Sequence, residues 1–203
     1  MYNYVFYVHI RSQSTGNCLY SSISLCLTGN NCIVNDLRLQ TSIELFLNAE
    51  FYSNHPTFHD AFVNNTSSFL CFDNILPLSV SLNSLDSGKK GIDLVQEEAI
   101  NNCNNENWSS FLCILALSSV CNKKIECLYP DFGLHKFKTL FSSTIIPRIA
   151  SLNNIDSFYI LFCYEGVLYD FSAPFQHNHY IPVIIKENLK QKISNESSKM
   201  LQK

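Results

Sequence analysis

The spacing of hydrophobic positions changes along the chain. From residue 18 to residue 121, apolar residues recur mostly at helical spacing, and the pattern predicts helices within residues 18–29, 35–54, 91–100 and 108–121. After residue 121, short apolar runs alternate with turn residues, which is typical of strands. One earlier run, YNYVFYVHI, is rich in aromatic and β-branched residues and predicts a strand or an extended lead-in near the start.

The first two predicted helices carry recognisable ends. In CLYSSISLCLTG one helical face holds Leu19, Ile23, Cys26 and Leu27, and Gly29 provides the stop. The second helix is expected to be capped by Asn35 or Asp36 and limited by Pro56. Its expected apolar stripe consists of Leu37, Ile43, Leu45, Phe46 and Leu47.

The later part of the chain predicts a sheet. Strands are expected in KIECLYP, SFYILFCYE, GVLYDFSA and HYIPVII, with a hairpin turn at Glu165-Gly166. Residues 57–90 have a loop-rich pattern with helical pieces. Helices first and strands late indicate an α+β fold of the α/β type, a mixed central sheet flanked by helices. We expect one domain over residues 1–187 and a polar tail over 188–203.

Composition excludes several classes of protein. The 203 residues carry a formal charge of -3 and no dense basic run, which argues against nucleic-acid binding. We find neither a membrane-spanning apolar run nor a signal peptide. The nine cysteines are odd in number and form no CxxC pair, so we expect reduced thiols, no metal, and a cytoplasmic protein.

The stretch QSTGNCLYSS holds the candidate chemistry. A thiol at the first residue of a helix lies near the positive end of the helix dipole, which lowers its pKa, so Cys18 is a candidate nucleophile. Gly16 would permit unusual backbone dihedrals that turn N–H groups toward a bound carbonyl. A base must come from elsewhere, and His179 in QHNHYIPVI is the candidate, with His177 as the alternative. Without a partner, Cys18 would be another buried thiol.

GNCLYSSIS resembles the catalytic-cysteine motif D-G-N-C-L-[FY] of the ovarian-tumour (OTU) deubiquitinases, and NHYIPV resembles their C-terminal His-Tyr motif. The LR of NDLRLQ and the tryptophan Trp108 stand between them in the family's order, and the resemblance spans about residues 12–185. It implies an OTU-like cysteine protease domain of the papain superfamily. Trp108 itself we expect to be a core or loop-packing aromatic.

The resemblance implies a role for each matching residue. Cys18 would be the nucleophile and His179 the general base, and the loop Thr15, Gly16 and Asn17 would form the oxyanion hole. The implied reaction is hydrolysis of an isopeptide or peptide bond after the C-terminal glycine of ubiquitin or a ubiquitin-like modifier, through a thioester. It implies no cofactor and no metal. Polyubiquitin chains would be the partners of a monomeric enzyme, cytoplasmic or delivered to a host cytoplasm.

The sequence departs from the family where the histidine is oriented. Family members carry an Asp three residues before the cysteine, or an Asp or Asn two residues after the histidine; Thr15 and Ile181 stand there. The third member therefore stays open among Thr15, Ser14, Asn178, Asp170 and a backbone carbonyl. Two rival functions follow: an inactive OTU-fold module that binds ubiquitin, and a cysteine protease or acyltransferase not directed at ubiquitin.

Overall fold

Helices and strands follow the sequence pattern closely in the part of the chain that can be described. The computed structural model describes residues 7–13, 15–56, 91–130, 138, 141–149, 156–163 and 179–185. Its helices are α1 (Cys18–Thr28), α2 (Val34–Leu47), α3 (Ala49–Ser53), α7 (Gly91–Asn102) and α8 (Phe111–Cys121). Its strands are β1 (Tyr7–His9), β2 (Lys124–Leu128), β3 (Thr144–Ile145), β4 (Ser157–Cys163) and β5 (His179–Ile185).

The five strands form one mixed sheet in the order β1-β5-β4-β2-β3. β2 and β4 are parallel, and the other neighbouring pairs are antiparallel. The predicted α+β fold with a mixed sheet is therefore confirmed, and the run before residue 10 does form a strand, with β5 as its partner. The short strand β3 was not predicted, because two residues are too few to show a pattern.

Pro182 marks the place where β1 leaves the sheet. The register of β1 and β5 ends at the pair His9–Val183, and the Ile10 N–H then donates to the Pro182 carbonyl at 3.1 Å. Proline has no N–H, so a proline on this side of β5 is tolerated only where the ladder stops. Beyond Ile10 the chain turns away along the start of β5 and leads into α1.

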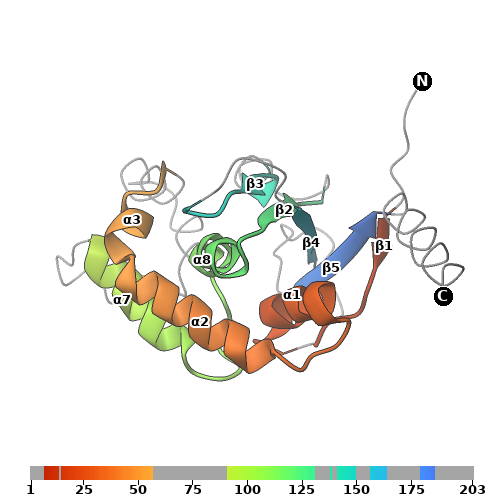
Figure 1. Cartoon of the computed structure of the whole chain (residues 1–203), viewed down its shortest axis with the longest axis horizontal. Coiled ribbons are helices and arrows are strands. Elements are labelled where there is room, and N and C mark those ends of the chain that lie inside the picture. Colours follow the sequence, from red (N-terminus) through yellow and green to blue (C-terminus); the bar gives the residue numbers. More distant parts are fainter. Residues whose placement is uncertain are drawn as a thin grey trace, which may run out of the picture.

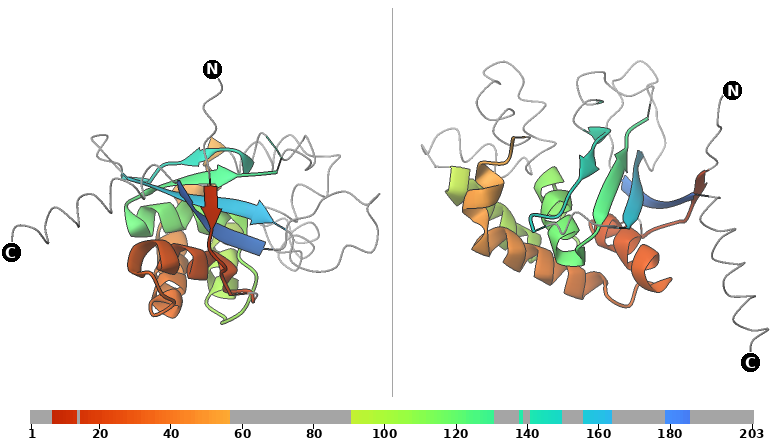
Figure 2. Two further views of the ribbon diagram at one scale, coloured as in Figure 1. Left: turned by 90° about the vertical axis from the view of Figure 1, so that its right-hand side faces the viewer. Right: turned by 45° about the horizontal axis from the view of Figure 1, so that its top comes forward.

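The described helices gather on one face of the sheet (Figures 1 and 2). α8 lies at the centre, packed against α2, β2 and β3, while α2 also packs against α7, and α1 packs against β5. α8 is apolar on all sides, as a fully enclosed helix should be, and its residues from Phe111 to Ser118 are buried. The helix predicted within residues 108–121 is therefore confirmed, with its start at Phe111.

Aromatic rings join the central helix to the sheet. The Phe141 ring lies 5.3 Å from the Phe111 ring and 5.0 Å from the Phe162 ring, and Phe162 in turn lies 5.1 Å from Tyr180, all measured between centroids. Such offset and edge contacts add to the gain from burying these side chains. The cluster fixes Tyr180, the residue that follows His179, from the side of the core.

α1 begins at Cys18 and ends as predicted. Gly29 follows it with φ of 77°, in the left-handed region, and its N–H donates to the Leu25 carbonyl. The predicted apolar face is wrong at Leu27, which is exposed. The buried residues run without interruption from Cys18 to Ser24, because the first two turns are enclosed between β5 and α2.

α2 differs more from the prediction. It begins at Val34 with Ile33 at the N-cap, so neither Asn35 nor Asp36 caps it, and Asn48 separates it from α3. Three members of the expected stripe are exposed, namely Ile43, Phe46 and Leu47. The inward face instead carries buried polar residues, listed here: Arg38, Thr41 and Ser42. Hydrogen bonds within the fold, described below, replace the missing apolar contacts.

Several predictions fall outside the described residues. These are the loop-rich region 57–90, the hairpin at Glu165-Gly166, the strand in GVLYDFSA, and the boundary between a domain ending at 187 and a tail over 188–203. Among the helices that are described, none combines the length and hydrophobicity needed to cross a membrane.

Candidate active site

Cys18 is the first residue of α1 and lies in the interior of the protein. Its side chain is 1% exposed. The preceding residues form a tight turn in which the Cys18 N–H donates to the Thr15 carbonyl at 3.0 Å, and the first helical bond runs from the Ser21 N–H to the Asn17 carbonyl. A substrate carbonyl can therefore reach the sulfur only after atoms that cover it have moved.

The sequence argument about the Cys18 pKa is corrected by burial. Desolvation raises the pKa of this thiol to about 11, because a lone thiolate is poorly stabilised in the interior. Backbone N–H groups of Tyr180, Leu19 and Cys18 itself, and the charge of Arg38, lower the pKa but do not offset the burial. The favourable helix end exists as predicted, yet it is the smaller effect. Ionisation here requires a partner that takes the proton.

The candidate for that partner, His179, stands at the start of β5. His179 is 4% exposed, and its Nε2 lies 2.9 Å from the Oγ of Ser12, which is equally buried. Ser12 Oγ also donates to the Tyr180 carbonyl at 2.6 Å. Since the Tyr180 N–H acts on the Cys18 sulfur while its carbonyl binds Ser12, the segments that bear Ser12, Cys18 and His179 converge on one residue.

A second serine fastens α1 to the same carbonyl. Ser22, one turn after Cys18, is fully buried, and its Oγ lies 2.9 Å from the Tyr180 carbonyl and 2.8 Å from the Cys18 carbonyl. The hydroxyl groups of Ser12 and Ser22 thus lie at the Tyr180 carbonyl, beyond the last residue pair of the β1–β5 ladder. α1 is held to β5 by hydrogen bonds as well as by packing.

The three residues proposed for the oxyanion hole form the turn before Cys18. The Asn17 N–H donates to Thr15 Oγ1 at 3.2 Å, and the Cys18 N–H is used by the Thr15 carbonyl. In this conformation the N–H groups of Asn17 and Cys18 are therefore already bonded within the turn, and they could bind an oxyanion only after it rotates. The oxyanion-hole assignment of Thr15, Gly16 and Asn17 stays a prediction.

Gly16 is required for a different reason from the one expected. A Cβ at this position would lie 1.7 Å from the Glu106 carbonyl oxygen and 2.7 Å from the Asn107 carbonyl carbon. Its φ is not in the left-handed region, which among the described glycines is occupied by Gly29. Glycine here allows close approach of two backbone segments, and so it holds the turn before Cys18 against residues 104–107.

Arg38 joins the turn before Cys18 to residues 104–107 by hydrogen bonds. Its guanidinium is buried and donates to Gly16 O at 2.8 Å, to Asn17 Oδ1 at 2.9 Å and to Asn107 O at 2.8 Å. Further bonds reach Asn102 O at 3.0 Å and Asn104 O at 3.1 Å, and the group also lies over the Tyr20 ring, 4.7 Å from its centroid. Carbonyl groups satisfy this cation, which also favours a thiolate at Cys18. The sequence had shown only an LR pair in the family's order.

A second buried cluster lies between α7 and α8. Glu98 is fully buried, its Oε1 accepts hydrogen bonds from Ser110 Oγ at 2.5 Å and from the Cys113 thiol at 3.4 Å, and its Oε2 has no hydrogen-bond partner among the described residues. Burial raises the pKa of Glu98 to about 7 and raises that of Cys113 strongly, with the Glu98 charge adding to the rise at Cys113. Burial and the Glu98 charge therefore both favour the neutral thiol form of Cys113.

Other candidate residues are not brought to the site by the described structure. Ser14, Asp170, His177 and Asn178 lie outside the described residues, so their roles stay predictions. Trp108 is 52% exposed, so it is not a core aromatic, and the alternative of a loop-packing aromatic stays a prediction. Within the described ranges, no three His, Cys, Asp or Glu side chains are grouped so that they could hold a metal ion.

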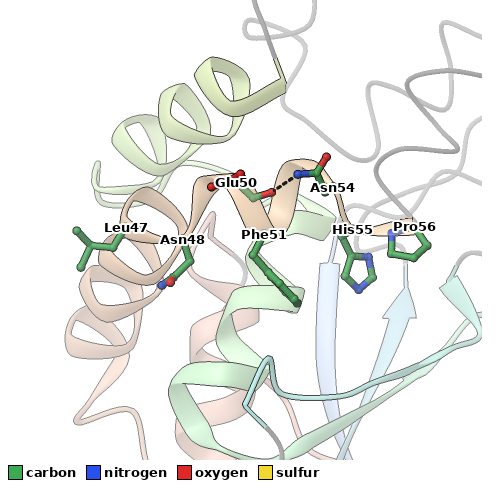
Figure 3. A pocket seen from close by; sticks show the side chains of 7 residues that line it. All are labelled: Leu47, Asn48, Glu50, Phe51, Asn54, His55 and Pro56. Atoms are coloured by element: carbon green, nitrogen blue, oxygen red, sulfur yellow. Dashed lines mark hydrogen bonds between the residues drawn. The ribbon is translucent and has the colours of Figure 1, made fainter.

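A hollow of about 700 Å³ lies at the far end of α2 from α1, around α3 (Figure 3). It is lined by Leu47, Asn48, Glu50, Phe51, Asn54, His55 and Pro56. In Figure 3 the Phe51 and His55 rings both point toward the same side of α3, and the Asn54 amide donates to the Glu50 carbonyl at 2.9 Å. None of these residues belongs to the segments around Cys18 or His179.

The comparison with protein families gives one match. The family model described as "Vertnin, OTU domain" matches residues 9–163. That range includes Ser12, Cys18 and Arg38, and it stops before β5, so the match says nothing of His179. No curated protein matches the chain.

Several solved structures are similar to the chain at low identity. The OTU domain of OTUD1 is 16% identical with a TM-score of 0.46, over 88% of this chain and 85% of that one. The viral OTU domain protease from Farallon virus is 14% identical with a TM-score of 0.45, over 90% and 86%. The viral OTU domain protease from Dera Ghazi Khan virus is 10% identical with a TM-score of 0.43, over 88% and 81%.

Proposed function

We propose that this chain, which belongs to the Vertnin OTU domain family, is a cysteine-type deubiquitinase. It would hydrolyse the isopeptide or peptide bond after the C-terminal glycine of ubiquitin or a ubiquitin-like modifier. The observation that carries the proposal is that the segments bearing Cys18, Ser12 and His179 meet at the Tyr180 backbone, which supports a pairing of the helix-end thiol with the buried imidazole. No cofactor takes part in this chemistry.

The reaction would proceed through an acyl-enzyme. The Cys18 proton passes to His179, and the thiolate attacks the carbonyl carbon of the modifier's C-terminal glycine. The resulting oxyanion is stabilised by amides of the Thr15–Asn17 turn after it has rotated. His179 returns the proton to the departing lysine amine as the C–N bond breaks, which leaves a thioester on Cys18. Water activated by His179 then hydrolyses the thioester and restores the thiol.

The imidazole is required because the thiol alone does not ionise at neutral pH. Burial raises the Cys18 pKa to about 11, so a thiolate is accessible only as an ion pair with protonated His179. Adduct formation should accordingly depend on two apparent pKa values that belong to the pair.

Partner and location form part of the same proposal. The enzyme would act as a monomer on polyubiquitin chains in the cytoplasm, or in a host cytoplasm if the source is a pathogen. The reducing conditions there suit a reaction that depends on a free thiol.

The decisive experiment is intact-mass measurement after mixing the protein with a ubiquitin probe that bears a C-terminal electrophile. We expect a gain of one probe mass in the native protein, no adduct in Cys18→Ala, and an adduct formed at least about 100-fold more slowly in His179→Ala. Cys113→Ala is the matched control, because it removes another buried thiol near a helix start, and it should form the adduct at the native rate.

A second function is favoured by the enclosure of Cys18 and the use of its N–H by Thr15. The chain would then be an OTU-fold module that binds ubiquitin without cleaving conjugates. Folded native protein that binds ubiquitin but forms no adduct with ubiquitin or related probes would support this second function and contradict the first. Cleavage of unrelated peptides, with indifference to ubiquitin, would point instead to a protease of another specificity.

A further inference from the structure

We propose that Ser12 is the positioning residue of His179 and holds its imidazole in the tautomer protonated at Nε2. The inference rests on the proposed function for its catalytic meaning, but the tautomer itself can be measured whether or not the protein is active. It fills the position left open by the departures at Thr15 and Ile181, and no sequence motif pointed to Ser12.

The direction of each hydrogen bond follows from the chemistry of the three groups. Ser12 Oγ carries one proton and lies 2.6 Å from the Tyr180 carbonyl oxygen and 2.9 Å from His179 Nε2. A carbonyl oxygen accepts and never donates, so the single hydroxyl proton is directed at Tyr180. The Ser12 oxygen then offers a lone pair to Nε2, and Nε2 must carry a proton in order to bind it.

That arrangement determines the state of the second nitrogen. A neutral imidazole protonated at Nε2 carries its basic lone pair on Nδ1. Nδ1 is then the nitrogen that takes the proton from Cys18 and later returns it to the leaving amine. The Nε2–H bond to Ser12 is unchanged through both transfers, so the ring keeps its orientation.

Burial makes the other tautomer of His179 unfavourable. Ser12 and His179 are both 4% exposed, and an imidazole that presented a bare Nε2 here would face a hydroxyl oxygen whose proton is already used. Two facing lone pairs in a place with little water are costly, because neither is satisfied by a hydrogen bond. If the Ser12 proton turned to a bare Nε2 instead, the Ser12 and Tyr180 oxygens would face each other at 2.6 Å with no proton between them.

A hydroxyl differs from the usual carboxylate in one respect. It orients the ring and selects the tautomer, but it brings no negative charge to stabilise the imidazolium. We therefore expect the ion pair of Cys18 and His179 to be less populated than a carboxylate would make it, with the thiol resting in its neutral form.

The test compares Ser12→Ala with Ser22→Ala. Both variants remove a buried hydroxyl from the Tyr180 carbonyl, but only Ser12→Ala removes the partner of Nε2. Two-bond ¹H–¹⁵N spectra of ¹⁵N-histidine-labelled protein, with His179 assigned by comparison with His179→Gln, report which nitrogen carries the proton. Native protein and Ser22→Ala should show His179 protonated at Nε2, and Ser12→Ala should show a mixture of tautomers.

Kinetics provide the second readout. Adduct formation with the ubiquitin probe should slow about 10-fold to 100-fold in Ser12→Ala, the range seen when a residue that orients a functional histidine is removed. Ser22→Ala should slow it far less, and Ser12→Thr, which keeps the hydroxyl, should restore the native tautomer and most of the rate. Thermal unfolding of all three variants separates a loss of stability from a loss of positioning.

The outcomes separate this inference from the proposed function. A native spectrum with His179 protonated at Nδ1, or a Ser12→Ala spectrum identical to the native one, would overturn the role of Ser12 even in an active enzyme. A native protein with the Nε2–H tautomer that forms no probe adduct would support the role of Ser12 and contradict the deubiquitinase.

Discussion

Cys18 and Cys113 are two buried thiols near the starts of two eleven-residue helices, and they differ in what surrounds them. Each backbone N–H closes a turn onto a carbonyl three residues earlier, of Thr15 and of Ser110. Backbone N–H groups and the charge of Arg38 lower the pKa of Cys18, whereas the Cys113 thiol donates to Glu98, whose charge raises the pKa of Cys113 further. Burial raises both pKa values. What distinguishes a candidate nucleophile is therefore the polarity of its neighbours.

The largest effect on stability should come from replacing Arg38, the buried cation whose charge lowers the pKa of Cys18. Arg38→Lys keeps a positive charge but cannot span the carbonyls of Gly16, Asn102 and Asn107, so buried acceptors lose their donors. We expect the free energy of unfolding to fall by about 4 kcal/mol. Urea unfolding measures this loss, and adduct formation with the ubiquitin probe should slow in parallel because the turn before Cys18 loosens.

Arg148→Lys is the matched control for that substitution. Arg148 is partly exposed, and its Nε lies 3.0 Å from Glu44 Oε1 in an ordinary ion pair. Its replacement should lower the free energy of unfolding by less than about 1 kcal/mol, with no change in adduct rate. Equal losses for the two arginines would contradict the role given to Arg38.

The next largest effect concerns Glu98, the carboxyl group that accepts a hydrogen bond from the Cys113 thiol. The folded-state pKa of Glu98 is raised from 4.5 to about 7, so the folded protein binds this proton more tightly than the unfolded chain does. The resulting stability is fully present below pH 4.5 and is lost as the pH rises through 7. The free energy of unfolding of the native protein should therefore fall by about 3 kcal/mol as the pH rises. Glu98→Gln, which keeps the Oε1 acceptor, should not show this loss.

Urea unfolding between pH 4.5 and 8 checks this expectation. The difference between Glu98→Gln and native protein should grow in favour of the variant as the pH rises. Glu50→Gln, at an exposed carboxylate, should follow the native curve. Parallel curves for native protein and Glu98→Gln would show that Glu98 ionises normally in the folded state.

A smaller effect on stability is expected from a substitution in the turn before Cys18. Gly16→Ala places a methyl group 1.7 Å from the Glu106 carbonyl oxygen, so one of two backbone segments must shift, at a cost of about 2 kcal/mol. Gly29→Ala, in open space but with φ of 77°, should cost about 1 kcal/mol and leave adduct formation unchanged. If Gly16→Ala retained the native adduct rate, the position of this turn would not matter for reactivity.

The sequence predicted most of the described elements but not the polar interior. α8 and the strands β2, β4 and β5 stand out because continuous or alternating apolar runs determine them locally. Arg38 could not be assigned a role, because a buried arginine looks like a surface arginine until the carbonyls that bind it are brought together by α7 and the turn before α1.

The sequence likewise pointed to some residues of the candidate site and not to others. Cys18 and His179 could be singled out because each lies in a recognisable motif. Ser12 could not be singled out, because it lies 167 residues before His179 in the chain. It comes to lie opposite His179 only because of the point at which β1 leaves the sheet. The exposed apolar residues of α2 were misplaced for a similar reason, since the helix periodicity gave no sign that its inner face would be polar.

The pairing of β1 with β5 also sets the order of events while the chain is made. Ser12 and Cys18 emerge from the ribosome early, but the strand that carries His179 is synthesised only after every other described element. Closing so long a loop is entropically slow and comes late in folding. Until that strand docks, Cys18 has no contact with β5, so a nascent or truncated chain would carry the candidate nucleophile without its proposed base.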